Sequence, residues 1–302
     1  MDHKIKLPPR LKVIAGYIER DACVADVGTD HGLLPAYLAQ NSLTRSITAT
    51  DISAGSLRAA LRTAEKYAVT DKITFAVADG LEGVEETETD TVVAAGLGGE
   101  TIIGILKNAP WTKKNGVRLI LQPQTKTEIL YGWLTAEGYI IRDATLARDK
   151  GRLYIVILAE GSGTAEQNTA AANTAAVNTA IANTAAANTA IANTAIANTA
   201  AVNTAIANTA AEQSTAVENA ATEELTVRVS LDPEIELLSL LGAKQNPLLS
   251  AYVEEQIKRT YKAVKGTQKS RSPVSAELEG KLRRLKEFME AQQRPTTPNN
   301  AQ

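Results

Sequence analysis

The sequence has little cysteine, few aromatic side chains and no long apolar run. Its 302 residues include one Cys, two His and 4% aromatic residues. A single cysteine, Cys23, excludes an intramolecular disulfide framework or a Cys-based zinc cluster, and two histidines far apart disfavour a His-rich metal site. No stretch approaches the roughly 20 uninterrupted apolar residues of a membrane-spanning helix, and the start MDHKIKLPPR lacks the apolar core of a signal peptide. We therefore expect a cytoplasmic protein with no metal and no membrane contact.

One segment differs from the rest of the chain in composition. Asn-Thr-Ala recurs every five residues from Asn168 to Asn208, and residues 161–223 hold four Glu but no Lys, Arg or aromatic residue. A five-residue period matches neither a helix nor a strand, so no face collects the few larger apolar residues. A pentapeptide β-helix is the alternative, but it needs a larger apolar residue in each turn. We predict a disordered or partly helical insert, and the predicted parts of the chain are 1–160, the insert at 161–225, a helical part at 226–292 and a disordered tail at 293–302.

Residues 1–160 alternate strand-like apolar runs with amphipathic helical stretches. A gap of only Asp149 to Gly151 separates the last two runs, which permits only an antiparallel hairpin. Strands with helical crossovers followed by a hairpin are the layout of class I methyltransferases, whereas dinucleotide dehydrogenases usually end with another crossover. We predict an α/β fold, a Rossmann-like methyltransferase sheet with a C-terminal antiparallel hairpin. The predicted strands are 23–28, 46–51, 73–79, 91–96, 118–123, 139–148 and 152–160.

The C-terminal part is helical and basic. A short strand at 226–229 precedes predicted helices at 234–242, 247–266 and 276–292, and the last two suit a coiled-coil hairpin. Residues 254–294 hold eleven Lys or Arg against six Glu, so this hairpin can follow nucleic-acid phosphates. The alternative is a solvated coiled coil with Tyr252 and Tyr261 in its seam. The candidate nucleic-acid contacts are Lys258, Arg259, Lys262, Arg283 and Arg284.

Carboxylates follow three successive predicted strands. Asp26 begins the loop D-V-G-T-D-H-G, Asp51 ends the second strand and Asp79 ends the third. The dinucleotide fingerprint G-x-G-x-x-G is absent because Asp30 replaces its second glycine. These acids disfavour a diphosphate and suit a cationic nucleoside such as S-adenosylmethionine. For each acid alone, the alternative is a helix cap or a turn former.

The candidate cofactor-binding residues lie at the ends of four predicted strands. The Gly-rich end of the fourth strand indicates backbone close to a ligand, with a plain tight turn as the alternative. Asp51 is placed to accept hydrogen bonds from the ribose, and Asp79 from the adenine amino group. The full set is Asp26, Gly28, Thr29, His31, Gly32, Asp51, Ile52, Asp79, Gly80, Leu81, Gly96, Leu97 and Gly98.

Several segments together resemble the bacterial TrmK family. They are RLKVIAGYI, VADVGTDHGLLPAYLA, VADGLE, AAGLGGETIIGIL, RLILQPQ and GRLYIVILAE within 7–160, and LLSLLGAKQNPLLSAYVEEQIKRTYKAV after the insert. The resemblance implies S-adenosylmethionine-dependent methylation of N1 of adenosine 22 in tRNA, with tRNA bound by the C-terminal hairpin. Two features depart from the family pattern: the insert, and Gln124 where the family has Asn.

For such a reaction, Asp30 is the candidate catalytic residue. A carboxylate beside the adenine would accept from its amino group and stabilise the positive charge that methylation leaves. The alternative is that Asp30 binds the methionine amino group of the cofactor. Alternative functions are methylation of another RNA or of a small molecule, and a non-catalytic RNA-binding protein with a vestigial cofactor fold. We expect a monomer, with an oligomer left open; the other candidate substrate contacts are Arg10, Gly99, Gln122, Pro123 and Gln124.

Overall fold

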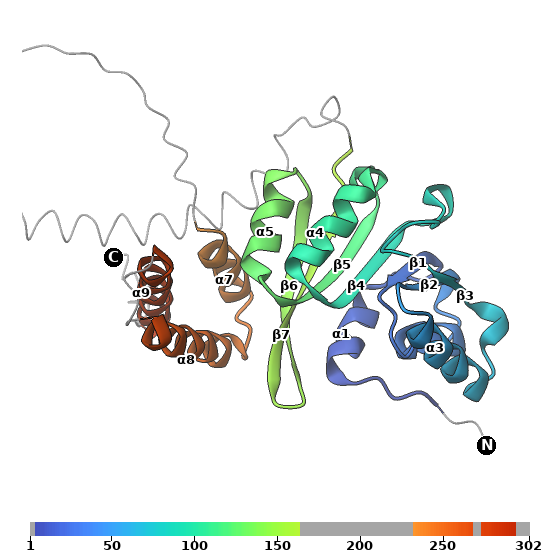
Figure 1. Ribbon diagram of the computed structural model, residues 1–302, viewed down its shortest axis with the longest axis horizontal. Helices are drawn as coiled ribbons and strands as arrows, with labels where there is room; N and C mark the ends of the chain where they lie inside the picture. The colour runs from blue at the N-terminus through green and yellow to red at the C-terminus, as the bar shows by residue number, and fades with distance from the viewer. Residues whose placement is uncertain (1–3, 164–231, 268–272, 294–302) are drawn as a thin grey trace, which may run out of the picture. The chain divides into compact units, whose positions relative to one another are not determined.

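The computed structural model describes residues 4–163, 232–267 and 273–293 (Figure 1). The predictions for the Asn-Thr-Ala insert, for a strand at 226–229 and for the tail after residue 293 lie outside these residues. The described residues before the insert and those after it group in one compact unit. Within the described part of the chain, no helix is both long and apolar enough to cross a bilayer.

A seven-stranded mixed sheet forms the centre of this unit, in the order β3-β2-β1-β4-β5-β7-β6. β1 pairs in parallel with β2 and β4, whereas β7 pairs antiparallel with β5 and β6. This order confirms the predicted methyltransferase sheet and its C-terminal hairpin, which projects beyond the neighbouring strands in Figure 1. The strands are β1 (Ala22–Val27), β2 (Thr44–Asp51), β3 (Thr74–Val77), β4 (Thr91–Gly98), β5 (Arg118–Thr125), β6 (Ile140–Asp149) and β7 (Arg152–Glu160).

Helices cover both faces of the sheet because side chains alternate between the faces along each strand. Val93 and Ile120 belong to the apolar core on the side of α1, α2 and α3, and Val92 and Leu119 belong to the core on the side of α4 and α5. Helix α1, which has Pro9 at its first position, was not predicted from the sequence. These helices are α1 (Pro9–Tyr17), α2 (Leu33–Gln40), α3 (Ala54–Lys66), α4 (Gly99–Asn108) and α5 (Thr127–Ala136), with 3₁₀ turns at Thr70–Lys72, Glu86–Glu88 and Pro110–Lys113.

The three predicted C-terminal helices are present as α7 (Pro233–Ala243), α8 (Leu249–Thr267) and α9 (Pro273–Gln293). Asp232 caps α7 by accepting from the backbone N–H of Glu234 at 2.9 Å. Leu237 and Leu241 of α7, Val253 of α8 and Leu285 of α9 lie in the same apolar core as α4, α5 and one face of the sheet. The C-terminal helices therefore extend the core of the sheet.

A cluster of charged side chains fixes α9 beside α5 and α7. Lys281 Nζ lies 2.9 Å from Glu128 Oε1 and 3.0 Å from Glu234 Oε1. Burial raises the pKa of Glu234, and Lys281 opposes that rise. Arg284 Nε lies 2.9 Å from Asp232 Oδ2, at the cap of α7. Because removal of one partner leaves a partly buried charge without compensation, these pairs hold the helices in one arrangement.

Gly99 gives a direct test of the packing between α4 and the loop that precedes α5. A Cβ at Gly99 would lie 2.9 Å from the carbonyl oxygen of Thr125 and would also collide with that of Lys126, whereas a Cβ at Gly104 meets nothing within 4 Å. We expect Gly99→Ala to lower the free energy of unfolding by about 1–3 kcal/mol, through overpacking. On the same helix, Gly104→Ala should raise it by about 0.5–1 kcal/mol. Urea unfolding measures both, and equal effects would contradict this packing.

Candidate functional site

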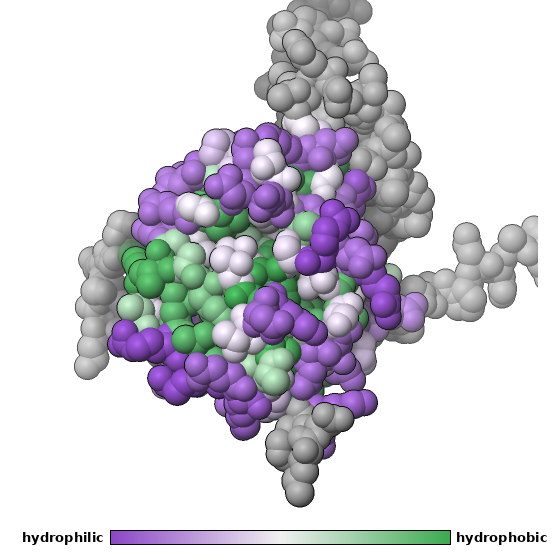
Figure 2. All heavy atoms as spheres, turned by 90° about the vertical axis from the view of Figure 1, so that its right-hand side faces the viewer, coloured by the Kyte–Doolittle hydropathy of each residue, from purple (hydrophilic) through white to green (hydrophobic). Residues whose placement is uncertain are grey.

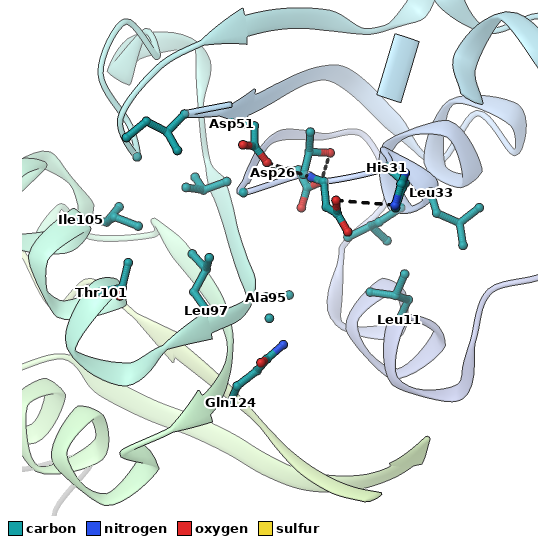
Figure 3. Close-up of a pocket in the computed structure, with 18 of the residues that line it drawn as sticks. Leu11, Asp26, His31, Leu33, Asp51, Ala95, Leu97, Thr101, Ile105 and Gln124 are labelled. Atoms are coloured by element: carbon teal, nitrogen blue, oxygen red, sulfur yellow. Dashed lines mark hydrogen bonds and ion pairs between the residues drawn. The ribbon is translucent and has the colours of Figure 1, made fainter. Parts of the chain in front are cut away.

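A cavity of about 500 Å³ lies at the carboxyl ends of β1, β2 and β4. In an open α/β sheet this edge, where the chain order reverses between β1 and β4, is where ligands bind. Its volume is in the range of roughly 300–1,000 Å³ that is usual for small-molecule sites. Figure 3 shows Asp26, Asp51 and His31 at one side of the cavity and Leu97, Thr101 and Ile105 at the other.

Asp26 is the buried acid of this cavity. It is the last but one residue of β1, and only 5% of its surface is exposed. Thr29 Oγ1 donates a hydrogen bond to Asp26 Oδ2 at 2.7 Å. Burial raises the pKa of the Asp26 carboxyl to about 7; the Thr29 hydrogen bond lowers it and the negative charge of Asp51 adds to the rise. A buried carboxyl with this pKa is a group that a bound cation would keep ionised.

Asp51 ties the loop after β1 to the start of α3. Its Oδ2 accepts from the backbone N–H of Asp30 at 3.1 Å, and its Oδ1 accepts from that of Ser53 at 2.8 Å. Each carboxylate oxygen has a second lone pair, so Asp51 can still accept from ligand hydroxyls. The side chain of Asp51 is thus oriented before any ligand arrives.

Asp30 and His31 lie at the mouth of the cavity. Their side chains are 73% and 75% exposed, and His31 Nε2 lies 3.8 Å from Asp30 Oδ1. Asp30 has a φ of +53°, the left-handed conformation that Asp adopts more readily than most residues. This conformation places an exposed carboxylate at the edge of the cavity.

The opposite wall is apolar. Leu97, Thr101 and Ile105 contribute from β4 and α4. Leu11 of α1 also lines the cavity, on the side of His31 (Figure 3). Ile52 lies at the rim beside Asp51 and is 71% exposed. Val77, on the edge strand β3, is 62% exposed. Figure 2 views the molecule from the β3 side and shows apolar residues gathered in the middle of this face, with hydrophilic residues around them. Carboxylates on one side and apolar residues on the other suit a ligand with a flat apolar ring and polar or cationic substituents.

Arg10 joins α1 to the end of β5 and to the β6–β7 hairpin. Its Nη1 donates to Gln122 Oε1 at 2.5 Å, and its guanidinium lies 5.5 Å from the ring centre of Tyr154. Gln122 is fully buried and does not line the cavity, so it positions Arg10. Gln124, two residues further along β5, does line the cavity.

The structure brings most of the predicted site residues together, but not all. Gly32 lies behind the wall, where a Cβ would come within 2.7 Å of Ala60 Cβ, so its small size serves the packing of α2 on α3. Pro123 and Arg259 line a second cavity. The predicted residues that line the first cavity are Arg10, Asp26, Gly28, Thr29, Asp30, His31, Asp51, Ile52, Asp79, Gly80, Gly96, Leu97 and Gln124, and those that line neither cavity are Gly32, Leu81, Gly98, Gly99, Gln122, Lys258, Lys262, Arg283 and Arg284.

Part of the apolar lining of the cavity, beyond Ile52 and Leu97, was not predicted from the sequence. Thr101 and Ile105 are four residues apart on α4, so one face of that helix supplies both. Their spacing indicates one face of a helix, but such a face can equally pack into the core, so the spacing alone does not identify a cavity wall. Leu11 was hidden because α1 had not been assigned. Among the described residues, no group of three or more His, Cys, Asp or Glu could hold a metal ion.

Comparisons with known proteins agree with this geometry. The sequence model of a family described as "Methyltransferase domain" matches residues 7–157. The tRNA (adenine(22)-N(1))-methyltransferase of Bacillus subtilis strain 168 is 34% identical over 158 residues, which is 52% of this chain and 66% of that protein. The match thus spans slightly less than two thirds of that relative.

Solved structures share the fold. The crystal structure of the Bacillus subtilis m1A22 tRNA methyltransferase TrmK has a TM-score of 0.66 at 23% identity, covering 94% of this chain and 99% of that one. A Streptococcus pneumoniae structure, solved in complex with S-adenosyl-L-methionine, has a TM-score of 0.64 at 20% identity, covering 94% of this chain and 100% of that one. At these identities the likeness shows the fold alone.

The sheet order and the cavity at its switch point define a class I methyltransferase domain. Because the family model matches half of the chain, the chain belongs to the family described as "Methyltransferase domain". The Bacillus relative at 34% identity agrees with the resemblance to the TrmK family.

The raised pKa of Asp26 predicts a specific dependence of stability on pH. The folded protein holds this proton more tightly than the unfolded chain, so the free energy of unfolding falls as pH rises from about 4 to about 7. Asp26→Asn stays neutral and should escape this loss. From about pH 5 to about pH 8 we expect the variant to gain about 3 kcal/mol relative to the wild type, as measured by urea unfolding. Parallel pH profiles for the two proteins would show that Asp26 is not a perturbed acid.

Proposed function

We propose that this protein transfers a methyl group from S-adenosylmethionine to N1 of adenosine 22 in tRNA. The observation that carries the proposal is the cavity itself, in which a buried acid, Asp26, and a fixed acid, Asp51, lie opposite an apolar wall. The Bacillus relative named for this reaction supports the substrate.

The residues present fit S-adenosylmethionine. Its amino group and sulfonium are cations, and the buried carboxyl of Asp26 would offset the charge of the methionine part. Asp51 would accept from the ribose hydroxyls, with Ile52 and Leu97 along the adenine and Asp79 at its amino group. Gly28 and Gly96 line the cavity with backbone alone. The other cofactor contacts of the sequence analysis that line the cavity are Thr29, His31 and Gly80.

In the reaction, the residues of this chain align and stabilise. When bound, S-adenosylmethionine supplies a methyl group on a positively charged sulfur. Adenine N1 already has a nucleophilic lone pair, so the protein needs to orient the base more than to deprotonate it. Asp30 at the cavity mouth would accept from the adenine amino group, and its charge would stabilise the cationic product. Arg10, held by Gln122, and Gln124 would position the base or its phosphate.

The tRNA would also contact the C-terminal helices. Lys258 and Lys262 are exposed on α8, as is Arg283 on α9. Lys258 Nζ lies 4.0 Å from Glu254 and Arg283 Nε 3.8 Å from Glu287, and such exposed pairs cost little to break. Arg284 instead pairs with Asp232, which favours a structural role for that side chain. We further propose a division into a methyltransferase domain and a basic helical arm, and a monomer that acts in the cytoplasm.

Replacement of Asp30 tests both the activity and the role of this residue. With labelled S-adenosylmethionine and tRNA transcripts, we expect the wild type to form 1-methyladenosine at position 22 and none when that position is guanosine. Asp30→Asn should lower kcat by about 100-fold or more, because it removes the charge that stabilises the product. Its affinity for S-adenosylmethionine, measured by calorimetry, should stay within several-fold of the wild type.

Asp71→Asn is the matched control, since Asp71 is an exposed acid on the 3₁₀ turn after α3. The control should behave as the wild type. If Asp30→Asn lost cofactor affinity in proportion to kcat, Asp30 would be a cofactor ligand. If the wild type transferred no methyl group to tRNA, the proposed function would be wrong.

A further inference from the structure

A second cavity, of about 370 Å³, lies beside the first. The loop between β5 and α5, the start of β7, and helices α8 and α9 line it. Gln124 lines both cavities. Tyr154 of β7 lines the second cavity, and its ring lies against the guanidinium of Arg10, which lines the first. A polymeric ligand with one unit in the first cavity would therefore have its next unit near the second cavity.

The second cavity carries an excess of positive charge. Its lining includes the cations Lys126, Arg152, Arg259 and Lys281 against the acids Glu128 and Glu255. Lys281 is committed to Glu128 and Glu234 and so serves the packing of α9. The other three cations are the ones that a ligand could reach.

Arg152 is the cation with the fewest competing partners. It is exposed at the start of β7, and it forms no ion pair with any residue of 4–163, 232–267 or 273–293. Arg259 lies on α8 and also lines the cavity, and its Nη2 lies 3.5 Å from Oε1 of the partly buried Glu255. Lys126 lies 2.5 Å from Glu100, also at the surface. Exposed pairs of this kind contribute little and can exchange for a phosphate.

Aromatic side chains accompany these cations. Tyr154 and Tyr252 both line the cavity, and both are partly buried. An aromatic face gives a ribose or a base a surface to pack on, without selecting its sequence. Two arginines with two tyrosines are the chemistry of a phosphodiester with its attached nucleoside, and neither a metal nor an apolar peptide would use them.

We propose that the second cavity binds the nucleotide adjacent to the methylated adenosine in the RNA. This inference rests on the proposed function, which places the target base in the first cavity. A base that reacts inside the first cavity must leave its stack, so its neighbours on the strand need a separate site. The phosphodiester lies between Arg152 and Arg259, and the adjoining sugar or base packs against Tyr154. Arg152 and Tyr154 are thereby assigned to substrate binding.

The double variant Arg152→Ala/Arg259→Ala tests this site. We expect KM for tRNA to rise by about 10-fold or more, and the affinity for S-adenosylmethionine to stay unchanged, because neither residue lines the first cavity. The slope of log affinity against log salt concentration should fall by about 0.7 for each lost phosphate contact on a single strand. Arg45→Ala is the control, since Arg45 is an exposed arginine at the start of β2, at the other end of the sheet.

The outcomes separate this site from the activity itself. An active double variant with the KM and salt slope of the wild type would overturn the inference. So would a raised KM with an unchanged salt slope, which would indicate a structural defect. If the wild type itself did not methylate tRNA, the proposed function would fail first, and the inference with it. A smaller slope of log affinity against log salt concentration in the double variant, with the slope of Arg45→Ala unchanged, would support nucleotide binding in the second cavity.

Discussion

The burial of one carboxyl, Asp26, at the end of β1 is the constraint on which the site depends. The parallel strands β2, β1 and β4 end at the same edge, and the loop after β1 covers Asp26 while Asp51 fixes that loop from the neighbouring strand. A buried acid without a positive partner is costly, so the apo protein keeps it partly protonated. A cationic ligand beside Asp26 would therefore favour the ionised form of this carboxyl.

The C-terminal helices pack on the apolar core that α4 and α5 form on one face of the sheet. Leu237 and Leu241 of α7 continue the apolar layer of α4 and α5, and Gly132 of α5 leaves room for Pro233, whose Cγ would lie 3.0 Å from a Cβ there. Lys281 then joins α9 to α5 and α7. Because these contacts place α8 opposite β7, they create the second cavity and bring Arg259 near Arg152. The shape of the second cavity therefore depends on how these helices pack.

The sequence predicted the sheet and the acids well, because both depend on local patterns. Strands alternate with helices in a readable way, and acids at the ends of parallel strands must converge, as Asp26, Asp51 and Asp79 do around one cavity. The sequence could not show which glycines line the cavity and which allow helices to pack closely, since both roles require a residue without a side chain. Contacts far apart in the chain decide between them, as Ala60 does for Gly32. The apolar lining and the role of Arg152 likewise depend on tertiary neighbours that no local pattern encodes.

If the cavity binds S-adenosylmethionine as proposed, it receives a positive charge beside Asp26. Calorimetry of S-adenosylmethionine binding tests it most directly, carried out near pH 6.5 in buffers with different enthalpies of ionisation. Ligand binding should lower the pKa of Asp26 from about 7, so the wild type should release more than about half a proton per site, and Asp26→Asn should release none of it. Binding without proton release, or equal release by the variant, would contradict the account.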